Sequence, residues 1–270
     1  MNAFCKLAVA TVAGLLIAGS TRAQDPAIGT EAKKPQMMAK DADPDWEVVA
    51  VRASDPQGMY GGYQVAGRDV QIRRKTVKSM LLYGYTAHES QLVNAPDWTR
   101  TELWDAKGYS DAPGQPNHQQ MQSLVRKLLA ERFGLVMHTE RKEMEAYALT
   151  VAKSGPRMTP SKGDPNGLAN ESDREDGGRM TMHAENLSMG ELAGLLMRLS
   201  LDRPAVDRTG LKGRYDFNLT WTPDDARTTA PDAPAGLFTA IQEQLGLKLE
   251  RVKTPVEVMV IDKVERPGAN

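Results

Sequence analysis

The side chains best suited to chemistry in this sequence are histidines with acidic neighbours. His138 is followed by Glu140 and Glu143, and on a strand the side chains at positions 138 and 140 point to the same face. Imidazole and carboxylate groups that converge in this way are metal ligands. We therefore take His138 and Glu140 as the candidate metal site; an exposed polar face of a hairpin is the alternative interpretation. His183-Ala-Glu185 matches half of a deaminase signature, but the cysteine ligands that complete that signature are absent.

Two further motifs indicate structure rather than catalysis. The stretch Gly108-Tyr-Ser110-Asp-Ala112 is one residue short of a hydrolase nucleophile elbow, and the Pro-Gly pair that follows favours a loop with an exposed serine. Asp207 precedes a turn at Thr209-Gly210, where its carboxylate is expected to accept backbone N–H groups. The sequence contains no glycine-rich phosphate loop and no S-x-x-K motif. It therefore predicts no catalytic residue and no cofactor.

The composition excludes thiol chemistry and argues against a nucleic acid partner. Cys5 is the only cysteine, and it lies in a segment that we expect to be removed, so the mature chain has no disulfide, no thiolate metal site and no cysteine nucleophile. Without Lys6 and Arg22, 32 basic residues stand against 35 acidic ones. Binding to the phosphates of a nucleic acid needs a basic face, which this balance does not favour.

The N-terminus has the features of a secretory signal peptide. Lys6 precedes an apolar run over residues 7–18, whose 12 residues are fewer than the roughly 20 that a membrane-spanning helix needs. Small residues at the −3 and −1 positions predict cleavage before Gln24. We expect residues 1–23 to be a signal peptide, the protein to be periplasmic or extracellular, and no stable membrane insertion after cleavage. Residues 24–44, which are rich in Ala, Lys, Pro, Asp and Met, predict a flexible tether.

A first structural repeat is predicted over residues 45–152. Thr76 and Asn117 are the expected N-caps of two helices, and Gly134 is expected to end the second helix. Strands are expected before, between and after these helices, and the last two form a hairpin around a charged turn at residues 140–145. In chain order, the expected elements cover residues 46–53, 63–72, 77–85, 104–109, 117–134, 135–138 and 146–152.

After a predicted linker at residues 153–179, a second repeat is expected over residues 180–266. Helix starts, helix ends and strands recur at one constant offset of 112 residues, as in the pairs Thr76 and Ser188, Gly134 and Gly246, and Glu145 and Glu257. The second repeat is likewise expected to end in a hairpin, formed by residues 247–252 and 256–261. Only two copies of a long unit are present, so the pattern predicts a duplicated domain rather than a solenoid.

The expected fold class is α+β, with two tandem copies of a β-α-β-α-β-β unit whose helices pack on small mixed sheets. The two copies are either separate sheets or parts of one continuous sheet.

Several stretches in order along the chain resemble a family of exported bacterial proteins of unknown function, the "Soli" family, which is expanded in soil acidobacteria. The resemblance covers roughly residues 45–266 and rests on the stretches at residues 45–52, 95–98, 128–133, 147–156, 206–217 and 254–262. It implies an exported, duplicated α+β domain and no established catalytic residues. Similar domains are fused to membrane metallopeptidases of the β-lactam-sensor type, which suggests sensing or interaction outside the cytoplasm. Each half is also loosely similar to the short N-terminal domain of secretins and TonB-dependent receptors.

The sequence therefore favours a non-enzymatic exported module that binds an envelope protein partner or a small ligand, with a cleft between the two halves as the natural binding place. Two alternatives stay open. One is a metal-dependent hydrolase that acts on envelope or extracellular polymer through His138 and nearby carboxylates. The other is an envelope scaffold that adds a strand to the edge of a partner's sheet.

Overall fold

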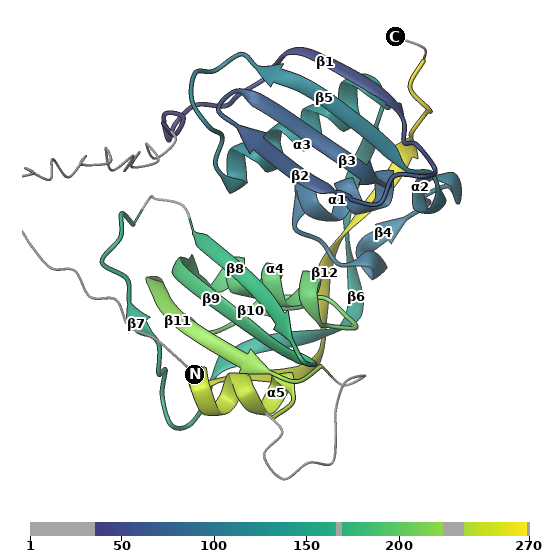
Figure 1. The fold of residues 1–270 in the computed structure, drawn as a ribbon. Helices are drawn as coiled ribbons and strands as arrows, with labels where there is room; N and C mark the ends of the chain where they lie inside the picture. The colour runs from purple at the N-terminus through teal and green to yellow at the C-terminus, as the bar shows by residue number, and fades with distance from the viewer. Residues whose placement is uncertain (1–35, 166–168, 224–234, 269–270) are drawn as a thin grey trace, which may run out of the picture. The chain divides into compact units, whose positions relative to one another are not determined.

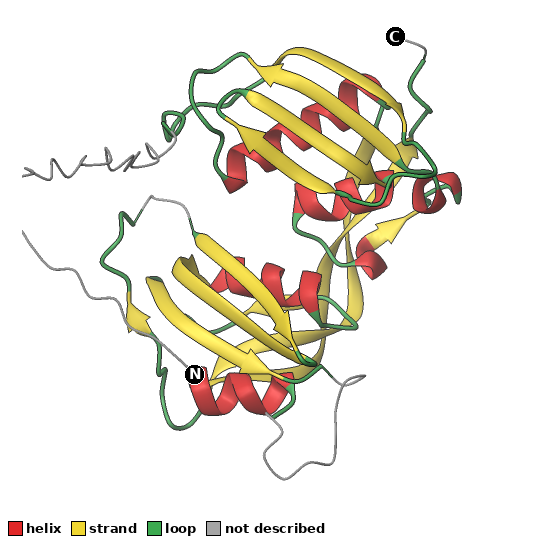
Figure 2. Ribbon diagram, viewed as in Figure 1, coloured by secondary structure: helices red, strands yellow, loops and turns green. Residues whose placement is uncertain are grey.

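The computed structural model describes residues 36–165, 169–223 and 235–268, all within one compact unit that covers residues 35–270. The fold is α+β, as the sequence predicts, and its strands form three four-stranded sheets (Figures 1 and 2). The predicted signal peptide, residues 1–23, and residues 24–35 of the predicted tether lie outside the described residues.

The first lobe contains an antiparallel sheet with the strand order β1-β5-β3-β2. Helices cover one face of this sheet, and Figure 2 shows them in red beneath the strands. Its elements are β1 (Trp46–Ala53), β2 (Gly62–Ala66), β3 (Asp69–Lys75), α1 (Val77–Tyr85), the short turn η1 (Glu89–Gln91), α2 (Trp98–Thr101), β5 (Trp104–Ser110) and α3 (His118–Arg132). The single strand expected over residues 63–72 is wrong: β2 and β3 are two strands joined at Gly67, whose φ of +60° allows the tight turn.

Local capping chemistry sets the ends of the helices in this lobe. The Thr76 hydroxyl accepts the Ser79 N–H at the start of α1, and Asn117 and Gln120 form a reciprocal capping box at the start of α3. Gly134, with a φ of +55°, follows the last turn of α3. These three predictions from the sequence are confirmed.

The second lobe contains an antiparallel sheet with the strand order β7-β11-β9-β8. Its elements are β7 (Thr159–Pro160), β8 (Asn170–Asp176), β9 (Arg179–Ser188), α4 (Met189–Leu199), β11 (Arg214–Trp221) and a last helix made of α5 (Leu237–Ala240) and η3 (Ile241–Leu245). The range 153–179, expected to be a linker, thus contains two strands of this sheet. Its polar composition misled the prediction because β8, at the sheet edge, is almost entirely exposed.

A central sheet with the order β10-β6-β12-β4 runs through both lobes. Its long strands β6 (Val136–Val151) and β12 (Leu247–Lys263) pair antiparallel over nearly their whole length, while β4 (Leu92–Val93) and β10 (Ala205–Asp207) add parallel pairs at the two edges. Both predicted hairpins are therefore wrong, because residues 136–151 and residues 247–263 each form one continuous strand.

The physical reason lies in the middle of the long strands. The charged residues 140–145 are exposed there, and they include none of the Gly, Pro or Asn residues that turns require. Pro255 is tolerated inside β12 because β4 pairs only with Met259 and Val260, so β12 is an edge strand at position 255.

Each long strand contributes side chains to both hydrophobic cores. Tyr147 and Leu149 of β6 and Leu247 of β12 are buried in the second-lobe core, whereas Met259 and Ile261 of β12 are buried in the first-lobe core. The largest fully buried side chains of the two cores are Phe133 and Trp221, both 0% exposed. The two lobes are therefore interleaved through the central sheet.

The described end of the predicted tether, residues 36–44, packs on the first lobe. Met38 is buried, and its N–H donates to the Gln115 carbonyl oxygen at 2.9 Å. The Gln120 amide donates to the carbonyl oxygens of Ala39 and Ala42 at 2.7 and 3.0 Å. The expectation of a flexible tether is thus wrong for these residues, because side-chain hydrogen bonds from α3 satisfy their backbone. Within the three described ranges, no helix is both long enough and apolar enough to cross a membrane.

Candidate functional site

A cleft of about 890 Å³ opens between the helices of the two lobes. This volume lies in the range of small-ligand and cofactor sites. The first lobe contributes α1, the start of α3 and the ends of β2 and β3, and the second lobe contributes α4 and β8. This is the place where the sequence predicted a binding site, although it named no residue of it.

Three rings form the first-lobe wall of the cleft. Tyr63 of β2 stacks on Tyr83 of α1 with ring centroids 4.2 Å apart and an interplanar angle of 22°, and His118 at the start of α3 packs edge-on against Tyr83 at 5.3 Å. Lys75 Nζ lies 5.3 Å from the centroid of the Tyr63 ring, within the range of a cation–π contact. The wall thus offers aromatic surface next to one cation.

The surrounding protein disfavours the charged form of each of the three rings. Burial raises the pKa of Tyr63 and the pKa of Tyr83. The His118 ring is exposed to the open cleft, yet loss of solvation from the surrounding protein lowers its pKa. The Tyr63 hydroxyl is buried and has no hydrogen-bond partner among the described residues. An unpaired buried hydroxyl is costly, so a polar group of a ligand that reached it would be favoured.

The second-lobe wall is rich in charged groups held by neighbours. Glu171 of β8 pairs with Arg198 of α4 at 2.8 Å, and Glu191 of α4 pairs with Arg214 at 2.8 Å. Burial alone would raise the pKa of Glu191, but hydrogen bonds from Ser188 and Arg214 outweigh it and lower the pKa. The wall therefore presents carboxylates with fixed positions rather than loose surface charges.

The two lobes meet at the inner end of the cleft. The Thr86 methyl lies so close to Gly194 that a Cβ atom on Gly194 would stand 2.2 Å from Thr86 Cγ2. On the other side, Gln122 Nε2 donates to the Tyr83 carbonyl oxygen at 2.9 Å and to Thr86 Oγ1 at 2.8 Å. The glycine thus allows α4 to approach the end of α1.

The predicted metal ligands His138 and Glu140 lie together but away from the cleft lining. His138 Nε2 is 3.3 Å from Glu140 Oε1, and His138 Nδ1 is 2.8 Å from Oδ2 of Asp262, a partner that the sequence did not single out. Glu143 projects from the opposite face of β6, because it is an odd number of residues away from Glu140 along the strand. In the part of the chain that the structure describes, no three His, Cys, Asp or Glu side chains are arranged to hold a metal ion.

His183 repeats this arrangement in the second lobe. Its Nδ1 is 2.6 Å from the Asn218 side-chain oxygen, and its Nε2 is 3.3 Å from Glu185. Both histidines thus lie on exposed strand faces between two hydrogen-bonding neighbours. Hydrogen bonds that Asp262 and then Glu140 accept raise the pKa of His138, and those that Asn218 and then Glu185 accept raise the pKa of His183.

The two other motifs have structural roles. Ser110 is the last residue of β5 and is 0% exposed, so the expectation of an exposed loop serine is wrong. The strand buries it because alternate residues of β5 face the core. Asp207 accepts the Thr209 N–H at 2.8 Å, as predicted for the turn.

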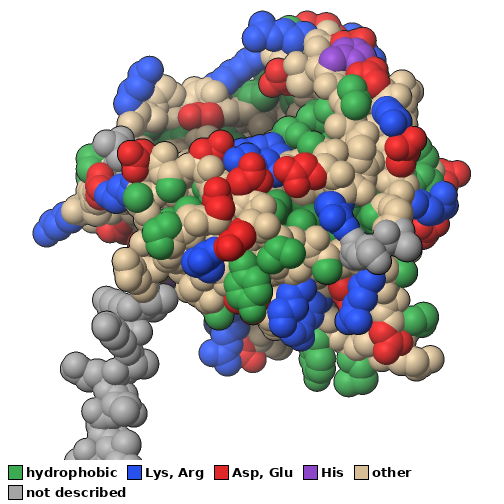
Figure 3. Space-filling view, turned by 90° about the horizontal axis from the view of Figure 1, so that it is seen from above, with side chains coloured by type: hydrophobic (Ala, Val, Ile, Leu, Met, Phe, Trp, Pro, Cys, Tyr) green, Lys and Arg blue, Asp and Glu red, His purple; other side chains and the backbone are tan. Residues whose placement is uncertain are grey.

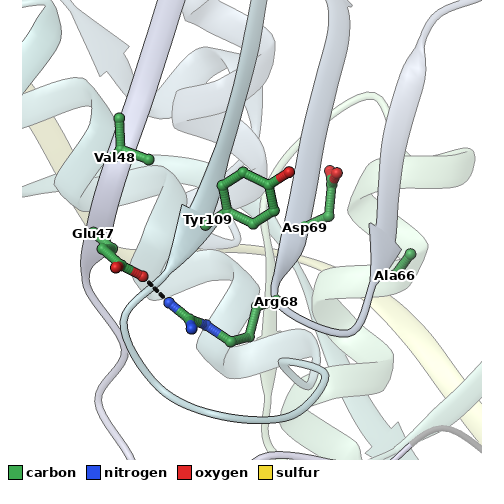
Figure 4. A pocket seen from close by; sticks show the side chains of 6 residues that line it. All are labelled: Glu47, Val48, Ala66, Arg68, Asp69 and Tyr109. Atoms are coloured by element: carbon green, nitrogen blue, oxygen red, sulfur yellow. Dashed lines mark hydrogen bonds and ion pairs between the residues drawn. The ribbon is translucent and has the colours of Figure 1, made fainter.

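A second, shallower hollow of about 530 Å³ lies on the outer face of the first-lobe sheet (Figure 4). Arg68 crosses it, pairs with Glu47 and donates through Nε to the Ser110 carbonyl oxygen at 2.6 Å. Tyr109 and Val48 lie exposed beside this pair. On the molecular face in Figure 3, basic and acidic side chains are interspersed.

A family model described as "Protein of unknown function (DUF3738)" matches residues 78–264, which is more than two thirds of the chain. No curated protein and no solved structure gave a match. The matched range includes α4, β8 and all of α1 except its first residue, Val77, but it excludes Tyr63 and Lys75.

Proposed function

Because this chain belongs to the DUF3738 family, whose description names no activity, we propose a function from its geometry: it is a non-enzymatic binding module that holds a ligand or a partner segment in the cleft between its lobes. The observation that carries this proposal is the stacked Tyr63–Tyr83 pair opposite the fixed carboxylates of α4 and β8. Apolar ring surface with a few positioned polar groups is the usual make-up of a binding site.

We further propose that the protein acts outside the cytoplasm, as a member of the exported "Soli" group. The support is the signal peptide pattern at residues 1–23. Mass spectrometry of the protein recovered from its native cells should find Gln24 as the first residue. Recovery of the chain with Met1 would contradict export.

Internal duplication belongs to the same proposal. Apart from β1, η1 and α2 in the first half and β7 in the second, the elements of the two halves follow the same order: β2, β3, α1, β4, β5, α3, β6 and then β8, β9, α4, β10, β11, α5 with η3, β12. Each half also adds a short strand to the long strand of the other half: β4 pairs with β12, and β10 pairs with β6. A gene duplication accounts for both features, and it makes the cleft the junction of two copies.

Blocking the cleft tests the proposed binding role. Gly190 lines the cleft, and no atom lies within 4 Å of a Cβ built on it, so Gly190→Trp should fill the mouth without disturbing the fold. Gly268→Trp, which is equally unhindered, is the matched control. A panel of dipeptides, disaccharides and aromatic acids would be screened for a shift in melting temperature. The proposal expects a compound whose shift is lost in Gly190→Trp and kept in Gly268→Trp. Equal shifts in both variants for every binding compound would refute it.

A second candidate is a metal-dependent hydrolase that acts through His138, which contacts Glu140 and Asp262 although the described residues form no metal-binding group of three. The purified protein would be dialysed against Zn²⁺ and its metal content measured. Under this candidate one equivalent of metal is retained, and His138→Ala loses it. Retention of no metal by the unaltered protein would remove the candidate.

A further inference from the structure

Two strands that end their sheets border the cleft. β2 is the last strand of the order β1-β5-β3-β2, and β8 is the last of the order β7-β11-β9-β8. Tyr63 of β2 and Glu171 and Asp173 of β8 line the same cleft, and Figure 1 shows each strand on the side of its sheet nearer the other lobe. An edge strand has a row of backbone N–H and C=O groups that no strand of its own sheet pairs. On the sides that border the cleft, no described strand pairs with the backbone of β2 or β8.

The floor between these edges is helical and partly apolar. Leu82 and Tyr83 of α1 and Leu195 of α4 line it. In each lobe, α1 or α4 packs against one face of the sheet of that lobe. A strand added beside β8 would cover α4 in the same way and bury apolar surface that now lines the cleft.

The charge of β8 selects the partner. Its seven residues, Asn170–Asp176, include four carboxylates and a single cation, Arg174. Glu171 and Asp173 pair opposite Ala184 and Met182, which are both buried, so these two carboxylates project to the helix side of the sheet and into the cleft. Side chains of opposite charge placed directly across two strands attract, and like charges repel.

We propose that the occupant of the cleft is an extended basic peptide segment, which pairs with the free edge of β8 and places an Arg or Lys side chain opposite Asp173, beside the Glu171 carboxylate that Arg198 already pairs. This inference rests on the proposed function, because it takes the cleft as the binding site. A small ligand, or an edge that is charged only to prevent self-association, is the competing explanation.

The test uses a synthetic heptapeptide of alternating Thr and Arg, acetylated and amidated, with a control in which Glu replaces every Arg. Binding to the whole purified protein is measured by isothermal titration calorimetry. The Arg peptide should bind, and the Glu peptide should bind at least tenfold more weakly. Two further Arg peptides carry N-methyl groups on alternate amides, in the two opposite phases. Backbone pairing requires that at least one phase loses binding by tenfold or more, whereas simple charge attraction leaves both unchanged.

Variants of β8 locate the contact. Asp173→Lys should weaken the Arg peptide about tenfold and strengthen the Glu peptide, because it turns a cross-strand attraction into a repulsion. Asp176→Lys makes the same charge change on the same strand, but its side chain projects from the other sheet face, so it should leave the peptide affinities within twofold of the unaltered protein. Both positions are exposed, which makes loss of folding a minor concern.

Equal effects of the two variants, or equal binding of both N-methylated peptides and the parent, would overturn the peptide proposal. Absence of binding by the Arg peptide would overturn it as well. The proposed function is judged separately: a small compound that loses binding in Gly190→Trp upholds the cleft as a binding site even when every peptide fails.

Discussion

The close approach of α4 to α1 predicts a strong energetic coupling between two residues that are 108 positions apart. Gly194→Ala places a methyl group 2.2 Å from Thr86 Cγ2, a separation that unstrained carbon atoms do not adopt. Thr86 has little freedom to move away. It adopts a φ of +50°, and rotation of its side chain would break the hydrogen bond that its Oγ1 accepts from Gln122.

The magnitude follows from two opposing effects. Overpacking of a methyl group costs about 1–3 kcal/mol. Alanine is preferred to glycine inside a helix by about 1 kcal/mol, which offsets part of that cost. We therefore expect Gly194→Ala to lower the free energy of unfolding by up to about 2 kcal/mol in the unaltered protein. In a Thr86→Gly background the clash is gone, and Gly194→Ala should raise the free energy of unfolding by up to about 1 kcal/mol.

Urea unfolding of the four proteins of this cycle, followed by tryptophan fluorescence, measures the coupling. A sign change of the Gly194→Ala effect between the two backgrounds supports the contact between the lobes. Thr86→Gly by itself loses a hydrogen bond but relieves a left-handed residue, so its own effect is expected to be small. If Gly194→Ala has the same effect in both backgrounds, α4 does not contact Thr86 and the reasoning is refuted.

Three further predictions concern single sites. Gly246→Ala should lower the melting temperature more than Gly210→Ala does. Both glycines have a positive φ, which costs alanine about 1–2 kcal/mol. Only at Gly246 would the added Cβ also meet a backbone oxygen, at 1.9 Å. Glu191→Gln should cost about 1–3 kcal/mol at pH 7. Because the folded state lowers the pKa of Glu191 from its usual 4.5, this stabilisation is present above that value and is lost as the pH falls through the lowered pKa, so urea midpoints of the variant and the unaltered protein should converge in acid. NMR titration should place the pKa of His138 above 6.5 and lower in Asp262→Asn, and an unchanged pKa in that variant would contradict the contact.

Features that depend on neighbours in the chain could be predicted from the sequence. The N-caps at Thr76, Asn117 and Ser188 are all observed, because a cap needs only a side-chain oxygen and the N–H groups of the next turn. The strand Trp46–Ala53 is observed with the expected bounds, since its run of β-branched residues lies between turn signals. The contact of His138 with Glu140 also follows from local geometry, as residues two apart on a strand share a face.

The residues of the cleft could not be predicted from the sequence, because no local pattern indicates that they lie together. Tyr63 and Tyr83 stack only after a strand edge and a helix have packed, and neither residue belongs to a motif. The same holds for Glu171, whose partner Arg198 lies on another element. Asp262 escaped for a similar reason: it meets His138 through the pairing of β6 with β12.

By itself the sequence determined the α+β class and the capped helices, because both follow from residue types at short spacing, whereas export and duplication stay predictions. Only the tertiary structure decided that the charged run at residues 140–145 is the middle of a strand rather than a turn. Charged residues are stable there because that stretch of β6 lies between the two cores, where its side chains stay in water while its backbone pairs with β12. Strand pairing between residues 96 to 127 positions apart has no local sequence signal, and here that pairing interleaves the halves and forms the cleft between them.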